Sequence, residues 1–585
     1  MFSQENSQSI KTGYPSIDKP WNQFYEGAER KDLFLNTTPY IGLIKNNKNH
    51  LTETAIEYFG AKISYGKLFE NINRVAKSLE KLGVKDGDFV TICSTTTPEV
   101  IYTFYALSKI GAAANIISPF FPEKDFLMRI DECKSKVIIF ADRFFPKYRE
   151  IFSEHPDKKV VILPLMNSTF LRFFSKRIKI NKSNEFSWNT FIKIGNNQKE
   201  TSVCPYEVHK PLAMVYSSGT TGASKGIVLS VDSFQKLINA YGNSGFEITR
   251  GKSIYQNVPP WHLTGLSLSI NFPLSYGVKI CIDPRFDQYL FVKNVLKFKP
   301  EYILTSAIMY QGFTLEKSLK KLKGKSLSFL KYPFSGGEVL TAKDVEQIES
   351  VLKTHGCKAR MLSGYGQCES GTTVTTDITN YKFSNSASGI PLRDIAIIGV
   401  FDENHKELKY KERGNIMVKS EVCMLEYLNN PKATEDYFYI DENGEKWCKT
   451  GDIGYINPDG SLVVQGRKSD CSVINGKTVY NFDIEAAVQT SPYVKICEVQ
   501  THPENPNELV AHIVWENEVA EIINNNPSKE MEYLRELQSG LKNLLVLPDA
   551  VPHLFCSWLS FPIATSGKRD IAFIKKSIDN IRELK

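Results

Sequence analysis

The stretch between residues 89 and 117 constrains the fold more strongly than any other part of the chain. It opens with "FVTIC", which is typical of a buried strand, and Thr97 and Pro98 then offer an N-cap and a first-turn proline for a helix towards Ile110. Gly111 is a natural end for that helix, and "AANII" supplies a second strand. Two strands joined by a helix at this spacing predict a parallel βαβ unit and an α/β class of fold.

The texture of the sequence changes twice further along. From about Gly389 it consists of short strands and turns, and "NPDG" at 457–460 between apolar runs predicts a hairpin. After "GRKSD" a mixed texture returns, with apolar residues at helical spacing from Met531 to Leu544 and Ser528 as a plausible cap. We therefore expect a large N-terminal domain (1–468) of α/β subdomains plus a small β-rich subdomain, followed by a small α+β C-terminal domain (469–585).

Composition excludes several classes of protein. The net charge of +7 is dispersed over 585 residues, which does not indicate a nucleic-acid partner, and no segment reaches the roughly 18 apolar residues of a membrane span. The first ten residues lack the features of a secretory signal, and the eleven cysteines show neither a C-x-x-C pair nor metal-ligand spacing. We expect free thiols, no structural zinc and a cytoplasmic location.

One segment has a composition that is compatible with contact to a membrane surface. "FLRFFSKRIKINK", residues 170–182, interleaves aromatic and basic residues, as segments that touch anionic membrane surfaces do. The alternative is a surface insertion whose aromatics pack inwards. We favour the insertion, because the segment shows no sustained helical period.

The segment "VYSSGTTGASKGIVLS", residues 215–230, has the composition of an anion-binding loop. Apolar strand-like runs flank it on both sides, whereas a Walker loop leads from a strand into a helix. Glycines let the backbone approach a ligand, hydroxyls and amides can bind phosphate oxygens, and Lys225 adds a charge. A mobile linker is the alternative, but linkers are seldom enclosed by core strands. The residues of the proposed cradle are Ser217, Ser218, Gly219, Thr220, Thr221, Gly222 and Lys225.

Further segments occur in an order that is specific to one superfamily. They are "PPWHLTG" (259–265), "SGGEVL" (335–340), "GYGQCES" (364–370), "KTGDIG" (449–454), "GRKSDCSVINGKTVYNFDIE" (466–485) and "PIATSGK" (562–568). With the loop above, they resemble the adenylate-forming superfamily: acyl- and aryl-CoA synthetases, adenylation domains of nonribosomal peptide synthetases and firefly-type luciferases. The resemblance implies that a carboxylic acid attacks the α-phosphate of ATP and that a thiol then captures the acyl-adenylate as a thioester.

The resemblance also implies roles for individual residues. Glu369 would bind Mg²⁺, Asp452 the ribose hydroxyls, and Lys568 would bridge the carboxylate and the α-phosphate. Thr220, in the phosphate loop, and His262, at the mouth of the acyl pocket, complete the implied catalytic set. The nucleotide site would further include Gly336, Gly337, Glu338, Tyr365 stacked on adenine, Gly366, Cys368 and Arg467.

The implied acyl pocket consists of His262, Leu263, Ser306, Ile308 and Met309. Its apolar residues suit a fatty or aryl acid. Since "PPWH" offers no carboxylate to a substrate ammonium group, an acid without an α-amine is expected. Ser469 and Asp470 would form the hinge about which the C-terminal domain rotates between the two half-reactions.

Several positions depart from the superfamily pattern: Cys368 replaces a threonine, Val473 a lysine, Ile571 an arginine and Ser469 an aspartate. These departures bear mainly on the thioester step. Coenzyme A is the expected acceptor, and the phosphopantetheine of a separate acyl carrier protein is the alternative. A non-catalytic protein that binds nucleotide or acyl-adenylate is an alternative of another class, and Lys225, Glu369, Asp452 and Lys568 argue against it.

Overall fold

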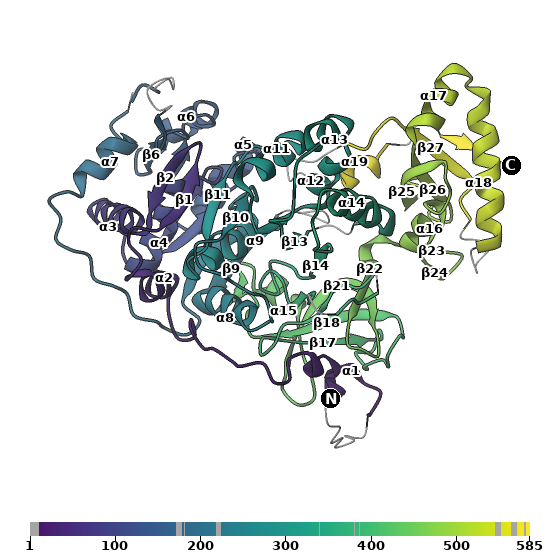
Figure 1. Ribbon diagram of the computed structural model, residues 1–585, viewed down its shortest axis with the longest axis horizontal. Helices are drawn as coiled ribbons and strands as arrows, with labels where there is room; N and C mark the ends of the chain where they lie inside the picture. The colour runs from purple at the N-terminus through teal and green to yellow at the C-terminus, as the bar shows by residue number, and fades with distance from the viewer. Residues whose placement is uncertain are drawn as a thin grey trace.

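Two largely parallel β-sheets, with helices between and outside them, form most of the N-terminal part of the molecule (Figure 1). The structure is a computed structural model and describes residues 11–170, 178–180, 182–217, 224–337, 340–378, 381–384, 386–544, 551–562, 570–577 and 581–584. Most of the basic and aromatic segment at 170–182 lies outside these residues.

The first sheet has seven strands. In spatial order they are β14 (Leu362–Ser363), β13 (Tyr332–Ser335), β12 (Tyr302–Thr305), β10 (Ser253–Gln256), β11 (Lys279–Ile282), β1 (Thr54–Tyr58) and β2 (Ala61–Ser64). All neighbours are parallel except β1 and β2. The carboxyl ends of six strands therefore meet at one edge, which is where open α/β sheets bind ligands.

The second sheet has eight strands. Their order is β19 (Glu426–Tyr427), β9 (Gly226–Ser230), β8 (Pro211–Tyr216), β4 (Ala113–Ile116), β3 (Phe89–Cys93), β5 (Val137–Ala141), β6 (Lys159–Leu163) and β7 (Glu185–Ser187). The strands from β8 to β7 are parallel neighbours, and β9 and β19 add an antiparallel edge.

The helices pack on both faces of the two sheets. Those of the N-terminal part are α1 (Pro15–Asp18), α2 (Pro39–Asn47), α3 (Tyr65–Lys81), α4 (Pro98–Ile110), α5 (Glu123–Glu132), α6 (Phe145–Ser153), α7 (Trp188–Ile194), α8 (Val231–Gly242), α9 (Leu263–Leu266), α10 (Phe272–Ser275), α11 (Gln288–Phe298), α12 (Ala307–Gln311), α13 (Glu316–Leu322), α14 (Ala342–Thr354) and α15 (Pro431–Tyr437). A π-helical turn, η3 (Ser267–Asn271), joins α9 to α10 without a break.

The predicted βαβ unit is confirmed in detail. The Thr97 hydroxyl accepts a hydrogen bond from the backbone N–H of Val100, and Gly111 ends α4 with φ of 80°. β3 and β4 pair in parallel. Every residue of α4 is buried, because the helix belongs to the core cluster that joins the facing sides of the two sheets. Its nearly continuous apolar sequence follows from that position.

A five-stranded antiparallel sheet forms the predicted β-rich subdomain. It contains β17 (Ala396–Phe401), β18 (Gly414–Ser420), β20 (Phe438–Ile440), β21 (Lys446–Ile456) and β22 (Leu462–Arg467). The hairpin predicted at Asn457–Gly460 joins β21 to β22, with the Asn457 N–H donating to the Ser461 carbonyl at 2.9 Å. β15 (Thr375–Thr376) and β16 (Ile390–Pro391) pair beside it.

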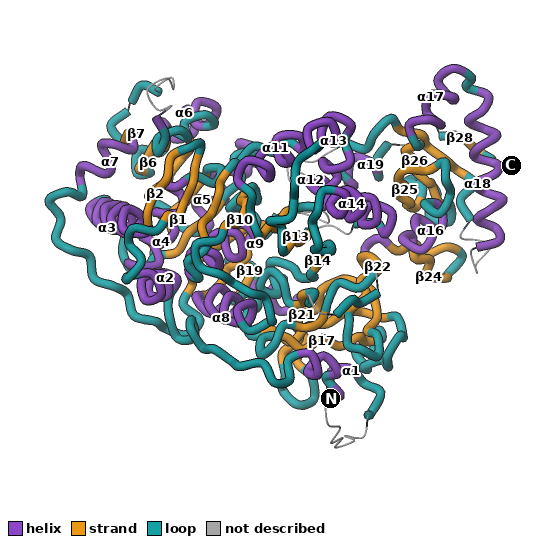
Figure 2. The backbone as a smooth tube through the Cα atoms, in the orientation of Figure 1, coloured by secondary structure: helices purple, strands orange, loops and turns teal. Residues whose placement is uncertain are grey.

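The C-terminal part lies at one end of the long axis of the molecule (Figures 1 and 2). Its strands are β23 (Cys471–Ile474), β24 (Lys477–Tyr480), β25 (Val494–Thr501), β26 (Leu509–Trp515), β27 (Leu554–Trp558) and β28 (Arg582–Glu583), and its helices are α16 (Asn481–Val488), α17 (Asn517–Asn525), α18 (Ser528–Leu544) and α19 (Ile571–Ile574). The capping role expected of Ser528 is wrong. Ser528 is already the first residue of α18, and its hydroxyl donates to the Asn526 side chain at 2.7 Å.

A short 3₁₀ turn, η5 (Lys468–Asp470), connects β22 to β23 at the position where the sequence places the domain boundary. Across this junction the Arg413 guanidinium donates to both carboxylate oxygens of Asp483, at 2.7 and 3.0 Å. Gly466 lies directly beneath Phe482, where an added Cβ would stand 2.1 Å from the ring. The boundary itself stays a prediction. Within the described residues, no helix has the length and apolar character needed to cross a membrane.

Candidate active site

The glycine-rich loop begins and ends at a closed neck between β8 and β9, two antiparallel strands, as the sequence predicts. The backbone N–H of Ser217 donates to the Lys225 carbonyl at 3.0 Å, and the N–H of Lys225 donates to the Ser217 hydroxyl at 3.0 Å. The Ser224 hydroxyl donates to the Ser217 carbonyl at 2.6 Å. Ser217 therefore holds the base of the loop together and fixes where Lys225 leaves the sheet.

Lys225 and Glu369 both contact Tyr427, a residue that the sequence analysis did not identify. The Lys225 ammonium lies 4.5 Å from the ring centroid of Tyr427, and the Tyr427 hydroxyl donates to Glu369 Oε1 at 3.0 Å. Burial and the neighbouring Glu369 carboxylate raise the pKa of Tyr427, so the phenol remains a hydrogen-bond donor. The backbone N–H of Met424 donates to the Glu369 carbonyl at 2.8 Å and fixes that turn.

Asp452 is the centre of a second group of polar side chains. It is 5% exposed, and its Oδ2 accepts hydrogen bonds from the Tyr365 hydroxyl at 2.6 Å and the Gln367 amide at 2.7 Å. The Arg467 guanidinium lies 3.5 Å from Oδ1 because β21 and β22 pair these two residues directly. Burial raises the pKa of Asp452, which Arg467 and the two donors partly offset.

Gln367 is the second residue that the sequence analysis missed. Its amide donates to Asp452 and also to the Thr450 carbonyl at 2.7 Å, so it ties the "GYGQCES" segment to β21. Gly366 allows this approach, since an added Cβ would stand 1.9 Å from the Thr372 carbonyl oxygen. The quoted motif contains Gln367, which was therefore within reach of sequence reasoning. Tyr427 was not, because its strand is only two residues long.

The carboxyl edge of the seven-stranded sheet carries the next predicted residues. Gly336 follows β13, and its N–H donates to the Thr305 carbonyl at 3.0 Å. Gly337 has φ of 87°, a conformation that favours glycine. The buried hydroxyls of Ser306 and Ser335 have no hydrogen-bond partner among the described residues. Polar groups of this kind at a sheet edge are suited to a ligand.

The predicted acyl-pocket residues do not all line one cavity, because two of them belong to different core clusters. Leu263, 1% exposed, belongs to the core between the sheets, whereas Met309, 0% exposed, belongs to a different cluster on the far side of the seven-stranded sheet. Ile308 is partly buried beside Met309, and its carbonyl accepts from Gln288 at 2.6 Å. His262 precedes α9 as its N-cap residue. These roles in the pocket stay predictions.

The remaining predicted residues divide into two sets. Cys368 is partly buried against the main core. Asp470, beside Ser469 in η5, accepts from the Lys575 ammonium at 2.9 Å. The predicted residues that lie outside the described part of the chain are Ser218, Gly219, Thr220, Thr221, Gly222, Glu338 and Lys568.

The α/β fold, and the contacts that link Lys225, Glu369 and Asp452 through the "GYGQCES" segment, agree with the adenylate-forming class that the sequence resembles. Residues 44–428 match the family model described as AMP-binding enzyme. The chain belongs to the AMP-binding enzyme family.

Individual relatives are distant in sequence. A long-chain-fatty-acid–CoA ligase of Bacillus subtilis (strain 168) is 24% identical over 80% of this chain and 84% of its own length. 4-Coumarate–CoA ligase 1 of Petroselinum crispum is 25% identical over 74% of this chain and 76% of its own length. The crystal structure of the anthranilate CoA ligase AuaEII in complex with anthranoyl-AMP has a TM-score of 0.77 at 19% identity, covering 94% of this chain and 98% of that one.

Proposed function

We propose that the protein activates a fatty or aryl carboxylic acid with ATP and transfers the acyl group to coenzyme A. In the first step a carboxylate oxygen attacks the α-phosphorus and pyrophosphate leaves. In the second step the thiol sulfur attacks the acyl carbon, the thiol loses its proton, and AMP leaves. The observation that carries the proposal is that Lys225 and Glu369 both contact Tyr427. Glu369 also lies in the same segment, "GYGQCES", as Gln367, which binds Asp452.

The chemistry of the first step explains these residue types. Two anions must meet, so their repulsion has to be offset by fixed positive charge and by oriented donors. Lys225 supplies a cation at the neck of the glycine-rich loop, and Tyr427 holds both Lys225 and Glu369 in place. Asp452 offers acceptor oxygens to ribose hydroxyls, and Tyr365 and Gln367 orient its carboxylate.

Glu369 suits a magnesium site in which one protein carboxylate binds the ion and the phosphates of the substrate supply further ligands. The described residues contain no cluster of three or more acidic, histidine or cysteine side chains. Mg²⁺ typically takes one or two protein carboxylates and obtains its other ligands from phosphates and water, so a single glutamate beside the loop is sufficient. When bound, Mg²⁺ would neutralise phosphate charge.

The segment from residue 469 onwards is proposed to act as a mobile domain that brings the Lys568 loop to the site during adenylation. Its rotation about Ser469 and Asp470 would then admit the thiol for the second step. Asp470 of the proposed hinge forms an ion pair with Lys575 of the same C-terminal segment, so these two residues would move together.

Two assays test the proposed function. Exchange of labelled pyrophosphate into ATP should depend on an added acid, and the purified enzyme with that acid and ATP should then form a thioester with coenzyme A. A phosphopantetheinylated carrier protein in place of coenzyme A tests the alternative acceptor. ATP binding without exchange for any acid would overturn the proposal and favour a protein that only binds nucleotide.

A further inference from the structure

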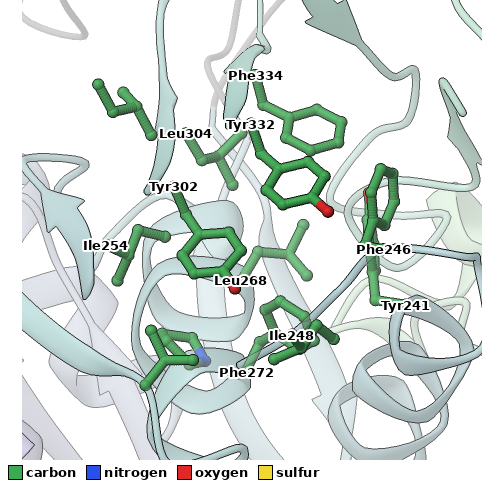
Figure 3. A pocket seen from close by; sticks show the side chains of 13 residues that line it. Tyr241, Phe246, Ile248, Ile254, Leu268, Phe272, Tyr302, Leu304, Tyr332 and Phe334 are labelled. Carbon is green, nitrogen blue, oxygen red and sulfur yellow. The ribbon is translucent and has the colours of Figure 1, made fainter. Parts of the chain in front are cut away.

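A cavity of about 60 Å³ lies between the seven-stranded sheet and the helical segment α9–η3–α10 (Figure 3). Tyr302 and Leu304 of β12, and Tyr332 and Phe334 of β13, line it from the sheet, and Leu268 and Phe272 line it from the helical segment. All thirteen lining residues are aliphatic, aromatic or proline. None of the residues described above as nucleotide-binding takes part.

The register of the strands places this cavity next to the carboxyl edge of the seven-stranded sheet, further back along β12 and β13. Tyr302 pairs with Tyr332 and Leu304 with Phe334 in parallel, so the cavity-lining residues form two successive rows on one face of the sheet. The two strands end at Thr305 and Ser335, and Ser306 and Gly336 follow them directly. Two residues of strand span about 7 Å, so the cavity begins that far behind the predicted acyl-binding segments and ends about 13 Å behind them.

Two aromatic side chains, Tyr302 and Tyr332, form the far wall of the cavity. Tyr302 and Tyr332 stack with an interplanar angle of 3° and centroids 5.3 Å apart. The Tyr302 hydroxyl donates to the Glu247 carbonyl at 2.7 Å and accepts from the Thr249 N–H, and the Tyr332 hydroxyl accepts from the Glu247 N–H at 3.0 Å. Both phenols thus form their hydrogen bonds with the backbone of residues 247–249, a segment that also contributes Ile248 to the cavity wall.

The size of the cavity limits what it can hold. A volume of 60 Å³ corresponds to about five water-sized groups, since one such group needs roughly 10–15 Å³ on this measure. A charged or hydroxylated group would lose its hydration there without gaining a partner, whereas a hydrocarbon group would leave water favourably.

We propose that this cavity receives the hydrocarbon end of the acid, so that the substrate class is an uncharged-tailed aliphatic monocarboxylic acid of medium length. The inference rests on the proposed function and deepens it. A span of about 13 Å corresponds to roughly ten carbon atoms, given a C–C bond of about 1.5 Å. The stacked tyrosines set the upper limit of length, and the absence of polar groups from the lining excludes a second carboxylate.

A series of acids tests the substrate class. Pyrophosphate exchange is measured with acetate, hexanoate, octanoate, 3-phenylpropanoate, palmitate and the dicarboxylate suberate. We expect kcat/KM to rise by about fourfold for each methylene up to octanoate and to fall for 3-phenylpropanoate, palmitate and suberate. A preference for acetate, 3-phenylpropanoate, palmitate or suberate would overturn the inference alone. Failure of every acid would instead overturn the proposed function.

A cavity-filling variant tests the location. Leu268→Phe should lower the ratio of octanoate to acetate kcat/KM at least tenfold, and the thermal shift that octanoate produces should disappear. Leu319→Phe, the same change at an exposed position on α13, should leave both unchanged. If Leu268→Phe does not fold, Phe272→Leu enlarges the cavity and should move the optimum to longer acids. An unchanged length profile in the variant that folds would contradict the assignment.

Discussion

At the scale of single residues, Tyr427 connects the two halves of the proposed phosphate site. Its ring faces the Lys225 ammonium and its hydroxyl holds Glu369, although 58 residues separate the two hydrogen-bonded partners in sequence. The composition of its loop identified Lys225, and the resemblance of its segment to the superfamily motif identified Glu369. Neither could identify Tyr427, whose position depends on how β19 pairs with the edge of the eight-stranded sheet.

Two substitutions separate the two contacts of Tyr427. Tyr427→Phe removes the hydrogen bond to Glu369 and retains the ring, so pyrophosphate exchange should fall by about tenfold. Tyr427→Leu also removes the cation–π contact, and exchange should fall by about a hundredfold. Tyr437→Phe deletes the hydroxyl of the neighbouring tyrosine and should have little effect. Equal rates for the two Tyr427 variants would show that the ring contact is not used.

Substitution of Gln367 should affect KM for ATP more than kcat, because Gln367 contacts Asp452, the proposed ribose-binding residue. Gln367→Leu should raise KM for ATP by about tenfold and change kcat much less, since a hydrogen bond to a charged group contributes about 1.5–3 kcal/mol. The exposed Gln23→Leu is the matched control. Initial-rate kinetics with varied ATP make the measurement, and a fall confined to kcat would refute the positioning role.

At the scale of elements, local signals predicted the strands and helices that are buried on all sides and those that carry strong caps. α4 is the clearest case, with its Thr97 cap and Gly111 end. Local signals gave the wrong cap for α18, since the hydroxyl of Ser528 turns back to Asn526. They also could not show that Leu263 and Met309 belong to separate cores, because the course of the chain between them decides that.

His512 of β26 makes the C-terminal sheet sensitive to acid. It is 0% exposed, its Nδ1 accepts from the Trp558 indole of β27 at 3.1 Å, and its Nε2 lies 2.9 Å from the Gln500 amide of β25. Burial lowers the pKa of His512 to about 4 from its ordinary value of 6.5.

The pKa of His512 is lower in the folded protein than in the unfolded chain, so the unfolded chain binds a proton more readily. Protonation therefore favours unfolding. Stability should therefore be lost as the pH falls from about 6.5 towards 4, by about 2 kcal/mol at pH 5. Urea unfolding at pH 7 and pH 5, followed by tryptophan fluorescence, measures the loss. His512→Gln should remove the pH-dependent part, and the exposed His209→Gln should retain it. The same loss in both variants would place the sensitivity elsewhere.

At the scale of the whole molecule, the part of the chain after η5 contacts the part before it through ion pairs that include Arg413–Asp483 and Lys343–Glu516. The ion pair between Arg413 and Asp483 is well aligned, but its side chains are 29% and 41% exposed. Exposed pairs of this kind contribute under about 1 kcal/mol each, and the Arg413 guanidinium also lies 4.6 Å from the ring centroid of Tyr480. Relative motion is the ordinary expectation for such an interface.

Ser469→Pro tests whether that motion is needed. Proline is tolerated in the first turn of a helix such as η5, but it restricts the backbone changes of a hinge. We expect acid-dependent pyrophosphate exchange to continue and thioester formation to be lost. Ser469→Ala, which leaves the backbone free, should support both steps. Equal loss of both activities in Ser469→Pro would argue against a hinge at this residue.

A substitution at Gly466 tests the same motion, because it should disfavour the present arrangement of the two parts of the chain. Because a methyl group there would overlap the Phe482 ring, Gly466→Ala acts as a wedge between the hairpin and α16. The substitution should disfavour the arrangement seen here and enrich any other that the chain can adopt. Small-angle scattering of Gly466→Ala against the parent protein would reveal that second shape, and identical curves would mean that the ring simply moves aside.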